Sequence, residues 1–202
     1  MDIVIESVKK LEVLLENSGC SDGGIQLDVD PDSVNCQYEK GACMTAEFGR
    51  KQGVFTTFDP IRACTKISFM FGATLDTPAV RGAAMAIVNV AAGFFCLVRT
   101  LHPCDRASHA ACGADLAAKL AGKQAYIVGE LHSLESVSGI HFTTDPSSAE
   151  VILIGGDGLI SPEAGELISR YAQKARIICV GPSTAGAARL NELEHWCPYG
   201  QS

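Results

Sequence analysis

Apolar and polar residues follow two different patterns over the first part of the chain, one typical of a helix and one typical of strands. Between Ile3 and Asn17 apolar residues recur every three or four positions, which predicts an amphipathic helix. Shorter apolar segments follow, and they predict strands at 24–29, 42–48 and 66–71. This mixture of helix and strand patterns indicates an α+β arrangement for the N-terminal part.

A long apolar segment comes next. Asp76 or Thr77 is suited to cap a helix with Pro78 in its first turn, and we expect this helix to continue to about Thr100. Residues 82–98 carry no charge, so this stretch approaches the length of a membrane span. Because it is rich in alanine and glycine and contains an asparagine, it favours a helix buried in protein, and we expect no membrane contact.

The pattern changes near residue 105. One more helix is predicted at 105–120, with Gly122 after its end. Short apolar segments then alternate with helical ones, predicting strands at 123–128, 139–143, 151–154 and 176–180, and helices at 161–174 and 185–195. Such alternation indicates a parallel, Rossmann-like sheet. The sequence therefore predicts an α/β protein, with a smaller α+β domain over 1–105 and a Rossmann-like domain over 106–202.

Composition narrows the class of protein. Hydrophobic residues make up 47% of the chain and charged residues 19%, as in folded globular proteins. The net charge is -7 and the cations are scattered, so we do not expect nucleic acid as a partner. The nine cysteines include no Cys-x-x-Cys pair, and the start of the chain is acidic where a secretory signal is basic. A cytoplasmic protein with reduced thiols is expected.

Three turns follow predicted parallel strands, and parallel strands bring such turns to one edge of a sheet. We therefore expect a ligand crevice formed by Gly129, Glu130, His132, Gly156, Asp157, Gly181, Pro182, Ser183 and Thr184. The helix that follows the last turn would favour an anionic group there. Alternatively, the turns are only the connections that any such sheet requires. None has the glycine spacing of a dinucleotide-binding or Walker loop, which disfavours classical NAD binding and phosphoryl transfer.

A second cluster contains two imidazoles and two thiols within a short stretch, and it consists of His102, Cys104, His109 and Cys112. These side chains suit a transition metal ion such as zinc, which makes such an ion the expected cofactor. The spacing matches no standard zinc finger. In the alternative interpretation Cys112 is a small apolar residue that packs beside Leu116.

Several segments together resemble a known family. They are the alanine-rich helix at 84–89, the strand segments 122–129 and 149–156, and the Gly-Pro-Ser-Thr turn at 181–184. They are similar to the heavy-metal chelation family, which was first catalogued as a domain of unknown function. The resemblance implies an α+β domain like the N-terminal domain of enolase, joined to a Rossmann-like domain. It also implies a cleft between the two that binds a heavy metal or a metal-chelating compound.

Three functional hypotheses remain open. The leading one is a cytoplasmic protein that binds a metal ion or a small metal-chelating molecule in the cleft between its domains. The alternative is a transferase-type enzyme acting on a nucleotide-like or adenosyl ligand, with Asp157 contacting a ribose. The third is a subunit of a homo-oligomer or a scaffold, which predicts a large apolar patch on the helix at 82–98.

Overall fold

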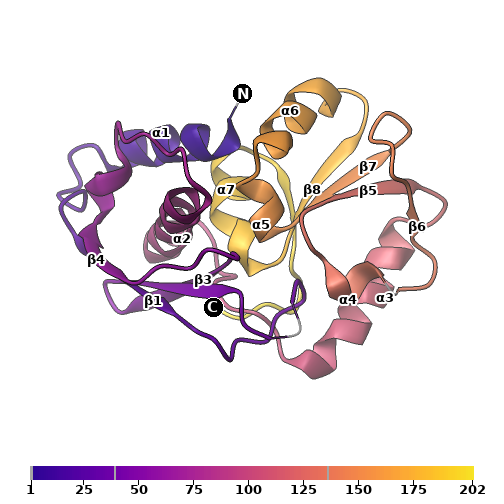
Figure 1. Ribbon diagram of the computed structural model, residues 1–202, viewed down its shortest axis with the longest axis horizontal. Coiled ribbons are helices and arrows are strands. Elements are labelled where there is room, and N and C mark those ends of the chain that lie inside the picture. Colours follow the sequence, from indigo (N-terminus) through magenta and orange to yellow (C-terminus); the bar gives the residue numbers. More distant parts are fainter. Residues whose placement is uncertain (1, 39, 136) are drawn as a thin grey trace.

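The computed structural model describes residues 2–38, 40–135 and 137–202. They form two halves side by side, each built around its own β-sheet (Figure 1). One sheet is antiparallel and the other parallel, which confirms the predicted two-part α/β architecture. The domain boundary at 105/106 stays a prediction.

The N-terminal half is a four-stranded antiparallel sheet with the strand order β3-β2-β1-β4. Its strands are β1 (Gly24–Val29), β2 (Cys43–Phe48), β3 (Lys51–Thr56) and β4 (Ala63–Lys66). The first helix, α1 (Ile3–Leu15), begins at Asp2, whose carboxylate accepts hydrogen bonds from the Val4 and Ile5 N–H groups. Such a cap satisfies N–H groups that the first turn of a helix leaves unpaired.

The long helix α2 (Pro78–Phe94) connects the two halves. Thr77, one of the two caps that the sequence suggested, accepts a hydrogen bond from Val80 N–H. Every residue from Arg81 to Gly93 is buried, because α2 packs against β2 and β3 on one side and against α1 and α7 (Ala185–Leu190) on the other. Within the described ranges, no helix is long and apolar enough to cross a membrane.

The C-terminal half is a five-stranded parallel sheet with the strand order β6-β5-β7-β8-β9. Its strands are β5 (Gln124–Val128), β6 (His141–Phe142), β7 (Val151–Ile154), β8 (Arg176–Val180) and β9 (Glu194–Trp196). Helices α3 (His109–Lys119) and α4 (His132–Glu135) cover one face, and α5 (Gly156–Leu159), α6 (Pro162–Tyr171) and α7 cover the other. The second face shares one hydrophobic core with the N-terminal half.

The structure differs from the sequence prediction in several elements. Strand β3 was not predicted, and the expected strand at 66–71 is instead a short 3-10 helix, Ile67–Met70. The helix predicted at 185–195 ends at Leu190, because Glu192 adopts a positive φ of 56° and turns the chain into β9. The apolar helix likewise ends at Phe94 rather than near Thr100. Two residues after this end, Cys96 adopts a positive φ of 57°.

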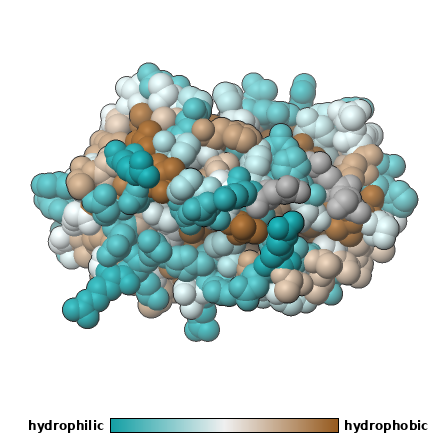
Figure 2. Space-filling view, turned by 60° about the horizontal axis from the view of Figure 1, so that its bottom comes forward, coloured by the Kyte–Doolittle hydropathy of each residue, from teal (hydrophilic) through white to brown (hydrophobic). Residues whose placement is uncertain are grey.

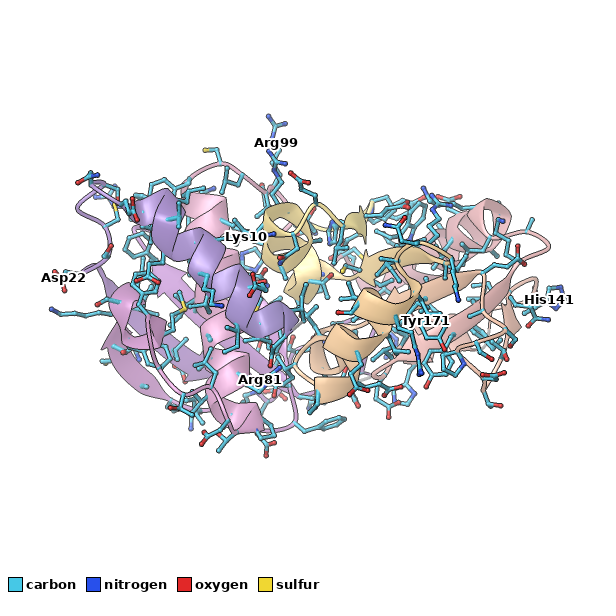
Figure 3. The ribbon with its side chains drawn as sticks, turned by 90° about the horizontal axis from the view of Figure 1, so that it is seen from above. Lys10, Asp22, Arg81, Arg99, His141 and Tyr171 are labelled. Carbon is cyan, nitrogen blue, oxygen red and sulfur yellow. The ribbon has the colours of Figure 1, made fainter. Side chains whose placement is uncertain are left out.

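The end of the chain returns to the start of the second half. Gln201 and His102 exchange backbone hydrogen bonds of 3.0 Å, and Leu101 accepts one from Val54 N–H in β3. At the start of α2, Arg81 forms an ion pair with Asp2, which precedes α1. Figure 3 shows the Arg81 side chain beside that end of α1. The first set of contacts ties the two halves together, and Arg81 adds a second link because its Nε donates a hydrogen bond of 2.6 Å to the Ile160 carbonyl.

Candidate functional site

The three predicted turns lie together at the carboxyl edge of the parallel sheet. Gly129 follows β5, Gly155 and Gly156 follow β7, and Gly181 follows β8. The first two turns touch closely at Gly158, where an added Cβ would collide with the Val128 carbonyl and lie 2.7 Å from Gly129 N. The absence of a side chain at Gly158 is therefore what allows α5 to start so near the end of β5.

A loop from the N-terminal half covers this edge. Its backbone accepts hydrogen bonds at Gln37 O from His132 N–H and at Cys36 O from Ser133 N–H, at 3.4 and 3.2 Å. Asn35 shapes the loop by accepting hydrogen bonds from Gln37 N–H and Tyr38 N–H through its side-chain oxygen. The crevice is thus closed on one side by protein from the other half.

Gln37 occupies the centre of the glycine turns. Its side chain is fully buried, and among the described residues neither its Oε1 nor its Nε2 has a hydrogen-bond partner. A Cβ added at Gly155 would lie 2.7 Å from Nε2, and one at Gly181 would lie 3.6 Å from Oε1. The glycines therefore leave room for the polar amide of Gln37. Buried amide groups normally have a hydrogen-bond partner.

Ser183 and Thr184 lie in the turn but are fully buried, with their hydroxyls paired inside the protein. Ser183 Oγ accepts a hydrogen bond from Thr56 N–H and donates one to Thr56 Oγ1, at 2.9 and 3.1 Å. Thr184 Oγ1 donates to Gly181 O at 3.0 Å. These contacts attach the turn to β3 and give both hydroxyls a structural role.

Asn89 of α2 strengthens the same attachment. Its buried amide nitrogen donates to Ser183 O at 2.7 Å and also contacts the carbonyls of Val54 and Pro182, at 3.2 and 3.3 Å. Its oxygen accepts a hydrogen bond of 2.8 Å from Gly186 N–H. One side chain thereby pairs four backbone groups from both halves, so the Gly-Pro-Ser-Thr turn is a structural joint.

Asp157 and Glu130 come together on the second side of the edge. Both carboxylate oxygens of Asp157 accept hydrogen bonds from Glu130 N–H, at 3.2 and 3.1 Å. Burial raises the pKa of Asp157, although the N–H groups of Glu130 and Gly158 oppose this. Asp157 therefore holds the Glu130 turn in place, and its remaining surface faces a groove.

The first groove at the edge has a volume of about 210 Å³ and lies between the two halves. It is lined by Val34, Asn35, Cys36, Tyr38, Arg106, His109, His132 and Ser133. The Tyr38 ring contacts the His132 imidazole edge to face at 5.3 Å, and His132 Nε2 lies 3.7 Å from a Glu130 carboxylate oxygen. Burial lowers the pKa of His109, and the charge of Arg106 lowers it further.

A second groove of about 340 Å³ lies beside Asp157. Its walls are mainly apolar and come from both halves, with Phe58 and Pro78 facing Ile160 and Pro162. Asp59 and Asp76 add further carboxylates to the lining. Phe58 is 59% exposed, although its ring packs on Tyr38 at 4.7 Å.

Three of the four metal candidates meet at a small cavity of about 20 Å³. Cys104, His109 and Cys112 line it, together with Cys36, Cys197 and Gly181. His102 does not line it, because its ring lies beside Gln52 of the antiparallel sheet. Among the residues that the structure describes, no three His, Cys, Asp or Glu side chains stand together as metal ligands.

Sequence patterns did not identify Cys36, Gln37, Arg106 or Cys197 as site residues. Cys36 and Gln37 belong to an irregular loop, and Cys197 follows a strand that was predicted to be helix. Only the fold brings them to the sheet edge. For the two cysteines, the only signal in the sequence is the high cysteine count.

Comparison with known proteins supports the fold. No family model matches the chain, and no curated protein matches it. Two crystal structures of DUF364 family proteins of unknown function are similar, each with a TM-score of 0.50. The Desulfitobacterium hafniense protein is 16% identical, covering 82% of this chain and 76% of its own. The Pyrococcus horikoshii protein is 14% identical, covering 91% and 79%.

These neighbours share the fold, and because their function is unknown they support the fold alone. They agree with the expected likeness to a domain of unknown function. The likeness to an enolase N-terminal domain stays a prediction.

Proposed function

We propose that this protein binds a small anionic, metal-chelating compound, or the metal ion itself, in the 210 Å³ groove between its halves. The observation that carries the proposal is the set of groups in that groove. Arg106 supplies a permanent positive charge, and His109 and His132 supply imidazoles, in a chain whose net charge is -7. A cationic groove on an acidic protein favours an anionic ligand.

The residues divide the work by their chemistry. The Arg106 guanidinium matches a carboxylate or phosphate in geometry and charge. The imidazoles of His109 and His132 offer nitrogen donors to a metal carried by such a ligand. Gly129, Glu130 and Asp157 hold the neighbouring turn in position, whereas Ser183 and Thr184 support the groove from inside the core.

Titration calorimetry tests the proposal with nitrilotriacetate, alone and loaded with Ni(II), as the probe. Arg106→Ala should weaken binding by about 10- to 100-fold, since a hydrogen bond to a charged group contributes about 1.5–3 kcal/mol. Arg170→Ala is the matched control, because Arg170 is exposed on α6, outside the groove lining. Equal affinity in the two variants, or no binding to the wild-type protein, would refute the proposal.

The 340 Å³ groove favours a second candidate, a transferase-type activity on a nucleotide-like or adenosyl ligand. Its apolar walls suit a base, and the Asp157 carboxylate beside them suits ribose hydroxyls. Thermal-shift measurements with S-adenosylmethionine and ADP separate the candidates. A ligand at a hundredfold excess over its Kd adds about 2.7 kcal/mol of stability, and Phe58→Ala should abolish that gain.

A further inference from the structure

Four of the nine cysteines meet at one enclosed cavity behind the cationic groove. They come from four segments: Cys36 from the covering loop, Cys104 from the chain before α3, Cys112 from α3 and Cys197 from the chain after β9. We call this 20 Å³ space the thiol cavity. The remaining lining is largely apolar, including Leu134, Val180 and Trp196.

The thiols are close enough to influence one another. Burial raises the pKa of Cys36 to about 12, and the neighbouring Cys112 and Cys104 add to that rise. Burial also raises the pKa of Cys197, and the same three thiols contribute to it. The four thiols line one cavity and influence one another, so they form a cluster and are not separate small apolar residues of the core.

The thiol cavity also has space and a nitrogen donor. Its volume of about 20 Å³ is that of a single water-sized particle, since about 10–15 Å³ suffices for one. His109 lines the cavity, and among the described residues its buried Nε2 has no hydrogen-bond partner. Soft donors, one-atom space and an unpaired nitrogen coincide at the same place.

We propose that the thiol cavity binds one soft d¹⁰ metal ion, for which Cu(I) is the test case, through the thiolates of Cys104 and Cys112. Thiolates select Cu(I), whereas structural zinc requires four ligands in a tetrahedron. Four thiols line the cavity, but among the described residues no three donors are positioned to ligate a single ion, which fits a two-coordinate metal better than a four-coordinate one. The inference rests on the proposed function and deepens it, since it names the class of metal held beside the groove.

The binding step balances without any oxidant. Two Cys S–H groups release their protons to water as two Cu–S bonds form, so Cu⁺ and two thiols give one bis-thiolate anion and two protons. The anion carries one negative charge. Arg106 lines the adjoining groove together with Cys36 and His109, so it places a positive charge on that side of the cavity.

Anaerobic titration of the reduced protein with Cu(I), in competition with bicinchoninate, tests the proposal. We expect one tight Cu(I) per chain and a thiolate-to-copper charge-transfer band in the ultraviolet. Cys104→Ser/Cys112→Ser should weaken binding by more than about 100-fold, because even outer-shell partners of a metal contribute up to that much. Cys64→Ser/Cys96→Ser is the matched control, because both thiols are exposed elsewhere, and it should keep the wild-type affinity.

A second measurement on the wild-type protein covers the case in which the cluster variant does not fold. Cu(I) should protect Cys104 and Cys112 from iodoacetamide, while Cys64 and Cys96 remain reactive by peptide mass spectrometry. Equal Cu(I) affinity in the two double variants, or protection of only the exposed cysteines, would overturn the inference. If Arg106→Ala still binds Cu(I) but no longer binds nitrilotriacetate, the result supports both the proposed function and the Cu(I) site. Cu(I) binding without any chelator binding removes only the proposed function.

Discussion

At the scale of single residues, the site combines predicted and unpredicted side chains. Cys104, His109 and Cys112 were identified because they lie close in the sequence, and they do share a cavity. Cys36 and Cys197 reach the same cavity only through the fold of distant segments. Spacing along a chain reports neighbours on one helix or turn, so donors from separate elements escape it.

His195 shows how burial at this edge creates a pH dependence. Its Nε2 lies 2.9 Å from Gly181 O, and burial lowers its pKa below the usual 6.5, against the raising effect of that carbonyl. Below pH 6.5 His195 therefore binds a proton in the unfolded chain while it stays neutral in the folded protein. Its contribution to stability is complete above pH 6.5 and is lost as the pH falls toward the folded pKa.

We expect His195→Gln to reduce the loss of unfolding free energy between pH 7.5 and pH 5.5 in urea titrations. His141→Gln is the control, since that side chain is exposed at the far end of the parallel sheet (Figure 3). The same slope in wild-type and His195→Gln protein would contradict this reasoning.

At the scale of elements, periodicity located most helices and strands because their buried faces are regular. Helix α1 and the parallel strands β5, β7 and β8 lie close to their predicted bounds. Strand β3 escaped notice because it begins with polar Lys51 and Gln52 and has a glycine in its middle. The short β9 has no alternation, since its three residues are all half-buried.

The start of α5 offers a test of element packing. Gly158→Ala places a methyl group against the Val128 carbonyl, so α5 must move away from β5. We expect a loss of about 3 kcal/mol in unfolding free energy, as for overpacked cores. Gly24→Ala is the matched control: a Cβ there has open space, and the change should stay within about 0.5 kcal/mol. Equal stability of the two variants would mean that α5 tolerates displacement.

At the scale of the whole molecule, α2 is shared by both halves. The sequence predicted a buried helix at this position, but its partners could not be predicted, since pairing across the chain leaves no local pattern. Residues 81–93 are buried and therefore contribute nothing to the apolar patch that the subunit-or-scaffold hypothesis expected at 82–98. On the face drawn in Figure 2, hydrophilic side chains dominate and hydrophobic ones appear in small separate patches.

Asn89 is the residue through which the joint can be tested. Asn89→Ala leaves backbone groups of β3, of the 181–184 turn and of α7 without their partner. At about 1–3 kcal/mol for each unsatisfied buried group, with partial relaxation, we expect a total loss of about 2–4 kcal/mol. Urea unfolding measures it, with Gln173→Ala in the exposed turn after α6 as control. A loss as small as that of the control would show that the halves are held by apolar packing alone.

The joint at Asn89 also has a consequence for synthesis on the ribosome. Asn89 and its partner Gly186 are 97 residues apart, so the partner emerges about 5–20 s later at ordinary elongation rates. During that interval α2 has left the ribosome without the elements that cover its outer side. The nascent chain therefore exposes the side of α2 that later packs against α7 until β8 and α7 have been made.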